Sequence, residues 1–362
     1  MSRHVLFVVH GMGVADPVAW TGAVKTQIES LAQQYANDGF PVDYLKQNVV
    51  VVPIGYGDIL TQKVREWQQQ AGSISDFAKA NHVDDHDVLD WLKSSDNKIQ
   101  QFFWSHVSHV VLYRFFPLVR EYVRVSVLRQ LVEGIQKYYL HQSECRCSVL
   151  AHSLGTAVTH DCLHILSSRQ SWRDPENGET IINPLQPNDF EFQSFFMVAN
   201  VSRLLESDYD AYKSIVRPGP HIGKSSNCIE YYSIDHALDP IPLAKRFAPD
   251  TWPTAPNLLG LSHLRRWNIH ELDHYLDHPK LHIPLLRTLT GDSSIPTAAA
   301  KREKAGYTQY EMDRVLQTEV QDIRAELEAV ILKPADGQKL AGYFTALSEA
   351  LDLINKLKAF LK

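Results

Sequence analysis

The stretch VLAHSLGTAV at residues 149–158 decides the fold of this 362-residue chain. An apolar strand runs directly into Ser153, and residues that suit a helix follow it. Ala151 and Gly155, two positions before and two after the serine, are both small. A nucleophile elbow needs small residues there, because its serine sits in a strained turn between strand and helix. The first of the two is usually glycine, and alanine takes its place here. The stretch predicts a nucleophile at Ser153; the alternative is a serine that only caps a helix.

Apolar runs on both sides of this stretch predict an α/β protein. A strand that is buried on both faces appears as a continuous, β-branched apolar run, which is typical of parallel sheets. Such runs predict strands at 5–9, 49–52, 145–150, 192–198 and 228–234, with a weaker one at 265–269. Helical spacing occurs near 18–36 and 118–139, and again from Pro279 onward. We therefore expect a mostly parallel, doubly wound sheet with helices on both faces.

The remaining segments suggest two domains. We expect an α/β domain over residues 1–290, with a helical insertion at about 60–140, and a C-terminal helical hairpin over 301–362. The insertion becomes aromatic at 102–116, which suits a lid over a site as well as it suits core. Residues 291–300 look like a linker, and the hairpin helices are expected near 307–332 and 337–361. Their apolar residues recur at spacings of three and four, so the seam could hold a second copy of the chain or another helical partner.

Composition excludes several other classes of protein. The net charge of −6 and the pI near 6.3 argue against a nucleic-acid-binding protein, which usually has a basic face. The four cysteines lack zinc-ligand spacing, so we expect reduced thiols and no metal. The chain shows neither a secretory signal at its start nor an apolar run of the roughly 18 residues that span a membrane. These features predict a cytoplasmic protein without a transmembrane segment.

A glycine-containing loop follows the first predicted strand. It reads His10-Gly11-Met12-Gly13. A loop of this kind can direct a backbone N–H group at the oxygen of a reacting carbonyl. Together with the elbow, it predicts an oxyanion hole formed by the N–H groups of Met12 and Leu154.

An acid and a histidine are expected further along the chain. Asp239 precedes a proline just beyond the strand at 228–234, where its carboxylate could orient an imidazole. Asp235 fits less well, because it still lies at the edge of the strand. Four histidines follow the last predicted strand, at positions 270, 274, 278 and 282. The last two lie beside or within a predicted helix, which leaves His270 and His274. We favour His274.

These motifs together resemble the α/β-hydrolase superfamily, over roughly residues 3–290. The stretches VLFVVHG at 5–11, VVLY at 110–113 and LDPIP at 238–242 are also loosely similar to intracellular lipases of the DDHD and serine-esterase types. The resemblance implies activity on carboxylic esters, often lipid esters, without a cofactor. The C-terminal hairpin has no counterpart in these families. The letters DDHD at 84–87 precede the elbow and receive no role.

Two functions follow as expectations. The first is a serine esterase or lipase that uses Ser153, His274 and Asp239, with a small-molecule ester or lipid as substrate. The second is a non-catalytic binding or scaffold protein of the same fold that acts through its C-terminal hairpin.

Overall fold

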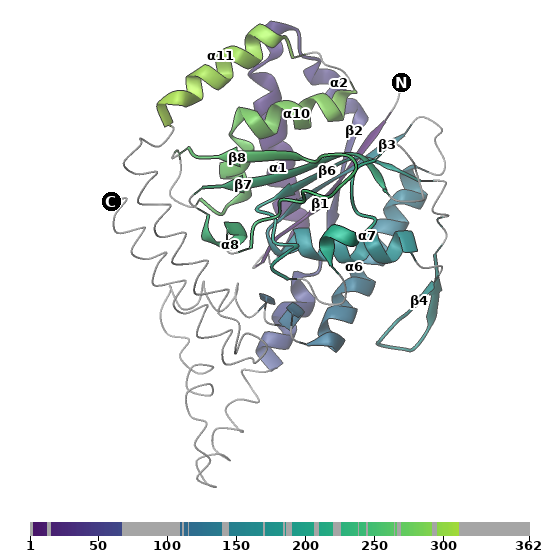
Figure 1. Cartoon of the computed structure of the whole chain (residues 1–362). Coiled ribbons are helices and arrows are strands. Elements are labelled where there is room, and N and C mark those ends of the chain that lie inside the picture. Colours follow the sequence, from purple (N-terminus) through teal and green to yellow (C-terminus); the bar gives the residue numbers. More distant parts are fainter. Residues whose placement is uncertain are drawn as a thin grey trace.

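The computed structural model describes residues 3–12, 16–66 and 109–310, apart from 111, 115, 140–144, 169–170, 184, 186–189, 206–209, 220–225, 238, 244, 264, 266–268 and 292–294. Within these residues a six-stranded sheet has helices on both faces (Figure 1). The strands are β1 (His4–Val9), β2 (Val49–Ile54), β3 (Arg146–His152), β6 (Phe192–Val198), β7 (Cys228–His236) and β8 (Asn257–Leu261). Their order is β2-β1-β3-β6-β7-β8, and each pairing is parallel. The predicted α/β class and mostly parallel sheet are confirmed.

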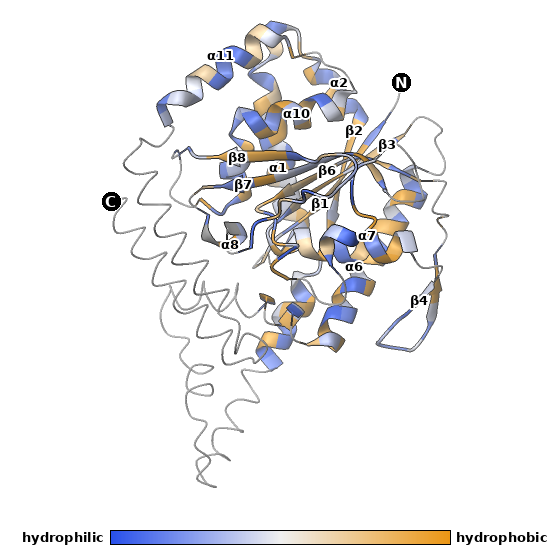
Figure 2. Ribbon diagram, viewed as in Figure 1, coloured by the Kyte–Doolittle hydropathy of each residue, from blue (hydrophilic) through white to orange (hydrophobic). Residues whose placement is uncertain are grey.

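Two layers of helices sandwich this sheet. One layer contains α6 (Pro117–Tyr138) and α7 (Leu154–Ser168); the other contains α1 (Pro17–Gln33), α2 (Val42–Asn48), α9 (Leu272–Leu276), α10 (Pro279–Thr290) and α11 (Thr297–Tyr307). The side chains of β1 alternate between the two cores, because successive residues of a strand point to opposite faces. Val5, Phe7 and Val9 pack with α6 and α7, whereas Leu6 and Val8 pack with the opposite layer. In Figure 2 the central strands are largely orange and the helices carry both colours.

Smaller elements complete the described chain. A two-stranded antiparallel sheet pairs β4 (Ser171–Arg173) with β5 (Thr180–Ile182), and α8 spans Pro240–Leu243. Short 3-10 helices span Ala36–Asp38, Ala211–Lys213 and Thr308–Tyr310. Among the described residues, no helix has both the length and the apolar character needed to cross a membrane.

The direction in which successive strands are added to the sheet reverses between β1 and β3. From β1 the chain passes through α1 and α2 to β2 on one side, and β3 then pairs with the other side of β1. In open α/β sheets, ligands bind beyond the carboxyl ends of the strands at such a switch point. The loops after β1 and β3 begin at His10 and Ser153, so the topology brings the predicted oxyanion loop next to the predicted nucleophile.

Two sequence-based expectations about the C-terminal part need correction. The sixth strand is β8 at Asn257–Leu261, whereas Arg265 and Ile269, at the ends of the predicted strand, lie in a bend and a turn. It is an edge strand with exposed residues and an internal glycine, so it lacks the apolar run of a strand buried on both faces. The expected linker at 291–300 already contains the start of α11. Ile295, Ala299 and Ala300 are buried against the core, so this segment packs on the α/β domain.

The helical insertion is described only in part. The helix expected near 118–139 is present as α6, and the chain also forms a helix over 57–66. Leu112 and Tyr113 of the aromatic segment are fully buried in the core, so this part is core and not a lid. Residues 102–108, together with most of the predicted hairpin (311–362), lie outside the described residues.

Candidate active site

Ser153 lies in the turn between β3 and α7, with a φ of 53°. This left-handed region costs a non-glycine residue on the order of 1–2 kcal/mol. Hydrogen bonds fix the turn on both sides. The N–H of Ser153 donates to the carbonyl of Val198 at 2.9 Å, and its own carbonyl accepts from the N–H and hydroxyl of Thr156 at 2.8 and 2.7 Å. Backbone strain that is held in this way is typical of functional sites.

Gly155 allows the first turn of α7 to lie directly on the end of β1. A Cβ atom at this position would overlap the carbonyl oxygen of His10 and lie 2.8 Å from that of Val9. A side chain therefore cannot fit without moving backbone. Ala151, the other small residue of the motif, is fully buried in β3 between Val9 and Met197 of the neighbouring strands.

A continuous chain of hydrogen bonds connects Ser153 to Asp239. The Oγ atom of Ser153 lies 2.8 Å from Nε2 of His270. The Nδ1 atom of the same imidazole lies 2.6 Å from Oδ2 of Asp239 and donates to it. Asp239 is fully buried and also accepts from the hydroxyl of Tyr275 at 2.7 Å and from the N–H of Ile241 at 3.2 Å. In this order the groups can take a proton from the serine and stabilise the imidazolium that forms.

The hydrogen bonds keep the acid ionised despite its burial. Burial by itself raises the pKa of Asp239, but the charge of His270 and the hydrogen bonds from His270, Tyr275 and the Ile241 N–H outweigh it, so the pKa lies below its usual range. Burial and the neighbouring Asp239 raise the pKa of Tyr275 well above its usual value. Tyr275 therefore stays protonated and acts as a donor to the carboxylate.

The prediction of His274 as the imidazole beside Ser153 is wrong. His270 occupies that place, in the turn that precedes α9, whereas His274 lies inside α9 and is fully buried. The Nε2 atom of His274 is 3.4 Å from Nε2 of His236 and 3.2 Å from the carbonyl oxygen of His263. The helix directs this ring toward β7 and the residues that follow β8, away from the elbow.

The remaining candidate residues, two histidines and one aspartate, form hydrogen bonds or ion pairs away from Ser153. The Nδ1 atom of His278 accepts from the N–H of Lys280 at 3.0 Å and caps α10. His282 makes a 2.7 Å hydrogen bond to the Tyr35 hydroxyl. Asp235, the less favoured acid, forms an ion pair with Arg246 at 3.1 Å. The structure therefore brings Asp239, and not Asp235, to the imidazole.

The loop after β1 packs against the elbow. A Cβ atom on Gly11 would lie 3.0 Å from Cβ of Ser153. Burial lowers the pKa of His10 to about 4, so its ring is neutral at pH 7. Its Nδ1 donates to the Gly11 carbonyl at 2.6 Å, and its Nε2 accepts from the N–H of Tyr56 at 3.3 Å. The Tyr56 hydroxyl donates to the His10 carbonyl at 2.8 Å, so side chains from the segments that follow β1 and β2 fix the shape of this loop.

The two predicted oxyanion donors belong to the loop after β1 and to the start of α7. Met12 is buried in the turn just after Gly11, and Leu154 is the first residue of α7. The N–H groups in the first turn of a helix have no partner within the helix, and the helix dipole there favours negative charge. Leu154 is therefore suited to an anionic oxygen next to Ser153, and Met12 follows Gly11, whose missing Cβ would lie 3.0 Å from Cβ of Ser153.

Within the described residues, one group of side chains has the composition of a metal site. His236, His263 and His274 are fully buried, and their candidate ligand atoms lie within 4.8 Å of one another. The rings of His263 and His274, however, are stacked 4.1 Å apart at an interplanar angle of 2°. The lone pair of an imidazole nitrogen lies in the plane of its ring, so one ion cannot lie in both planes. The arrangement fits a packed histidine cluster next to Tyr275 and does not fit a three-histidine metal centre.

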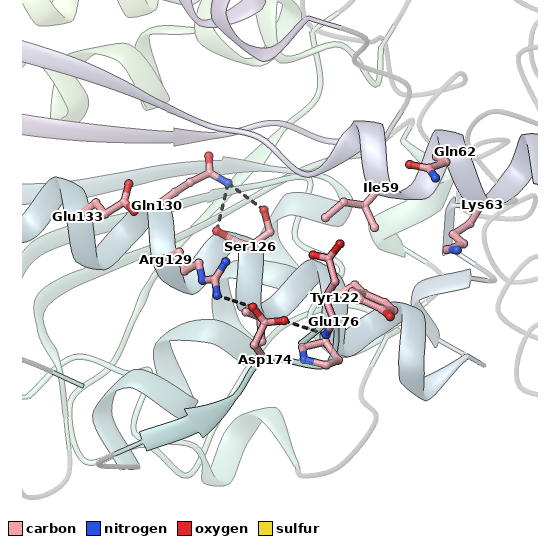
Figure 3. Close-up of a pocket in the computed structure, with 12 residues that line it drawn as sticks. Ile59, Gln62, Lys63, Tyr122, Ser126, Arg129, Gln130, Glu133, Asp174 and Glu176 are labelled. Carbon is pink, nitrogen blue, oxygen red and sulfur yellow. Dashed lines mark hydrogen bonds and ion pairs between the residues drawn. The ribbon is translucent and has the colours of Figure 1, made fainter. Parts of the chain in front are cut away.

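A cavity of about 550 Å³ lies elsewhere in the molecule (Figure 3). Its wall is formed by the helix over 57–66, by α6 and by the turn at 174–176. The lining is largely polar. An Arg129–Asp174 ion pair connects α6 with the turn at 174–176, and the Gln130 amide bonds to Ser126 within α6 (Figure 3). Ser153, His270 and Asp239 are not among its lining residues, so this cavity is separate from the hydrogen-bonded chain.

Sequence reasoning missed three residues that shape the site. Tyr56 and Tyr275 had no signal in the sequence, because each reaches its partner only through the fold. His152 was visible inside the elbow motif but received no role. Its Nε2 lies 2.7 Å from the carbonyl oxygen of His270, 118 residues along the chain.

Comparisons with known proteins did not place the chain in a family. No family model matches it, and no curated protein matches it. Its chemistry therefore has to be inferred from the arrangement of its own residues.

Proposed function

We propose that this protein is a serine hydrolase of the α/β-hydrolase type that cleaves carboxylic esters. The hydrogen-bonded series Ser153–His270–Asp239, with the serine on a strained strand–turn–helix elbow, is the observation that carries this proposal. The order Ser, Asp, His along the chain is the order of that fold. The parallel sheet, and the position of the site at its switch point, give further support.

In the first half of the reaction, the Oγ atom of Ser153 attacks the carbonyl carbon of the ester. Nε2 of His270 takes the serine proton, and Asp239 holds the Nδ1–H tautomer and stabilises the imidazolium. The carbonyl oxygen becomes an oxyanion, which accepts hydrogen bonds from the N–H groups of Met12 and Leu154. His270 then gives its proton to the departing alkoxide, which leaves as an alcohol, and the acyl group stays on Ser153.

In the second half, water replaces the serine as the nucleophile. His270 takes a proton from the water as the water attacks the acyl carbon, and the same N–H groups stabilise the second oxyanion. Collapse of this intermediate returns the proton to the Ser153 oxygen and releases the carboxylic acid. The cycle uses no cofactor and no metal.

Labelling with a fluorophosphonate probe tests the proposal before the natural substrate is known. We expect labelling of the folded protein at Ser153, mapped by mass spectrometry, and none in Ser153→Ala. Ser202→Ala is the matched control, because Ser202 is also buried and bonds to Asn200 instead of the series. Folded protein that is not labelled at Ser153 would contradict the proposal.

A panel of p-nitrophenyl esters, with acyl chains from acetyl to palmitoyl, then defines the substrate class. A preference for long chains indicates a lipase, and a preference for short chains indicates an esterase. If Ser153→Ala keeps full biological activity, the protein is instead a non-catalytic binding protein.

A further inference from the structure

His152, the residue before the nucleophile, contacts both loops that complete the site. Its Nε2 lies 2.7 Å from the carbonyl oxygen of His270 and must donate to it, because a carbonyl only accepts. Its ring lies 5.1 Å from the ring of His270 and 6.4 Å from that of Tyr275. On the other side, a Cβ atom on Gly11 would lie only 3.0 Å from Nδ1 of His152. One buried side chain therefore touches the loops of the imidazole and of the oxyanion donors.

We infer that His152 is a positioning residue, which holds the backbone of His270 and the Gly11 loop in register with Ser153. The inference rests on the proposed function, because it assigns His152 a part in the reaction of the same site. His152 does not touch the reacting atoms. It acts through His270, whose two ring nitrogens are already engaged with Ser153 and Asp239.

The backbone of His270 needs an anchor of this kind. Its side-chain hydrogen bonds allow the ring to tilt about the line between Ser153 and Asp239. The bond from His152 to the carbonyl fixes a third point that is off this line, and so fixes the orientation of the ring. Because a misplacement of about 1 Å can lower a rate by about 100-fold, the loss of this anchor should reduce the rate of the chemical step.

The connection to Gly11 makes the arrangement specific to this site. A Cβ atom on Gly11 would lie 3.0 Å from Nδ1 of His152 and equally close to Cβ of Ser153, so the Gly11 backbone packs next to both residues. The chain leads from Gly11 directly to Met12, a proposed oxyanion donor. The same imidazole therefore sets the distance between base and oxyanion hole, so its loss should affect kcat more than KM.

Three variants separate positioning from simple packing. In His152→Gln the side-chain amide reaches about as far as Nε2 and can donate to the His270 carbonyl. In His152→Asn the same amide is one methylene shorter and cannot reach it. His152→Leu fills the space without a donor. We expect His152→Gln to keep kcat within about 3-fold of the wild type, and the other two to lose about 10- to 100-fold with KM within about 3-fold.

The second readout is the rate of fluorophosphonate labelling at Ser153, which needs no substrate and should follow the same order. Circular dichroism checks that each variant is folded, and if His152→Leu does not fold, the comparison of Gln with Asn decides. Equal rates for Gln and Asn, or a wild-type rate in a folded His152→Leu, overturn the inference while a dead Ser153→Ala keeps the proposed function. Activity in Ser153→Ala overturns the proposed function itself.

Discussion

At the scale of the residue, two non-glycine positions among the described residues adopt a left-handed backbone. Ser153 has a φ of 53° and Ala199 a φ of 49°, each directly after a strand. Both are held by hydrogen bonds to the next strand: Ser153 donates to Val198, and Ala199 donates to Ile234. The strain at Ser153 is compatible with folding because neighbouring strands fix the turn.

The backbone strain at position 153 should be measurable as a difference in the free energy of unfolding between two variants. Ser153→Ala and Ser153→Gly both remove the hydroxyl, so we expect each to lose at least about 1000-fold in kcat. Glycine accepts a positive φ without strain but loses more chain entropy on folding. The free energy of unfolding of the glycine variant should therefore be higher than that of the alanine variant, by up to about 1 kcal/mol. Urea unfolding of the pair measures this difference. An alanine variant of greater stability would show that the turn is not strained.

Substitutions of His270 and His274 should affect different properties, the first kcat and the second the stability of the fold. His270→Gln removes the proposed base, so we expect kcat to fall by at least about 1000-fold with little change in stability. His274→Gln disturbs a buried hydrogen-bonded cluster, so it should lose about 1–3 kcal/mol of stability and keep kcat within about 10-fold. Kinetics and urea unfolding of both variants test this. A large loss of kcat in a stable His274→Gln would restore His274 as the base.

At the scale of the element, the approach of α7 to β1 decides whether the site can form. The first turn of α7 lies on the carbonyls of Val9 and His10, and only a residue without Cβ permits that contact. The same contact brings Ser153 and the start of the helix beside Gly11. The packing of one helix on one strand therefore brings the proposed nucleophile next to the proposed oxyanion loop.

Alanine at two helical glycines tests this packing. Gly155→Ala should cost about 3 kcal/mol or more or prevent folding, because the new methyl group overlaps backbone that cannot move aside. Gly22→Ala is the matched control: it lies in α1, is exposed and has nothing within 4 Å of its missing Cβ. We expect it to gain about 0.5–1 kcal/mol. Thermal or urea unfolding decides, and a small cost at Gly155 would mean that α7 does not approach β1 so closely.

At the scale of the whole molecule, several histidines are buried without charge. Burial lowers the pKa of His4 and His236 to about 3, and that of His10 and His282 to about 4. Their ordinary value is 6.5. Between pH 6.5 and about 4 the unfolded chain therefore binds more protons than the folded one. Stability from this source is complete above pH 6.5 and is lost as the pH falls.

This linkage predicts that the folded protein loses stability on acidification at a pH well above the range in which carboxylates titrate. Each such histidine contributes a slope of up to about 1.4 kcal/mol per pH unit, so the free energy of unfolding should fall between pH 7 and pH 5. Asp239 adds a loss at lower pH, because its folded pKa lies below the ordinary 3.8. Urea unfolding across this range measures the slope, and His4→Gln should reduce it. Equal stability at pH 7 and pH 5 would contradict the burial of neutral histidines.

Sequence by itself determined the features that depend on local pattern. Five of the six parallel strands appear as apolar runs, and three of them, β1, β3 and β6, are almost fully buried. The elbow around Ser153 is visible because a strained turn restricts its neighbours to small residues. The edge strand β8 could not be predicted in this way, because half-exposed residues leave no such pattern.

Only the tertiary structure decided which imidazole lies beside Ser153. His270 and His274 are four residues apart and offer the same chemistry, and the preference for His274 was wrong. The start of α9 at Leu272 separates them: the turn before it directs His270 to the elbow, and the helix turns His274 toward His236. The hydrogen bonds of His152 and Tyr275 could not be predicted for the same reason, since their partners lie 118 and 36 residues away. Contacts at such distances along the chain depend on how the elements pack, which no local pattern records.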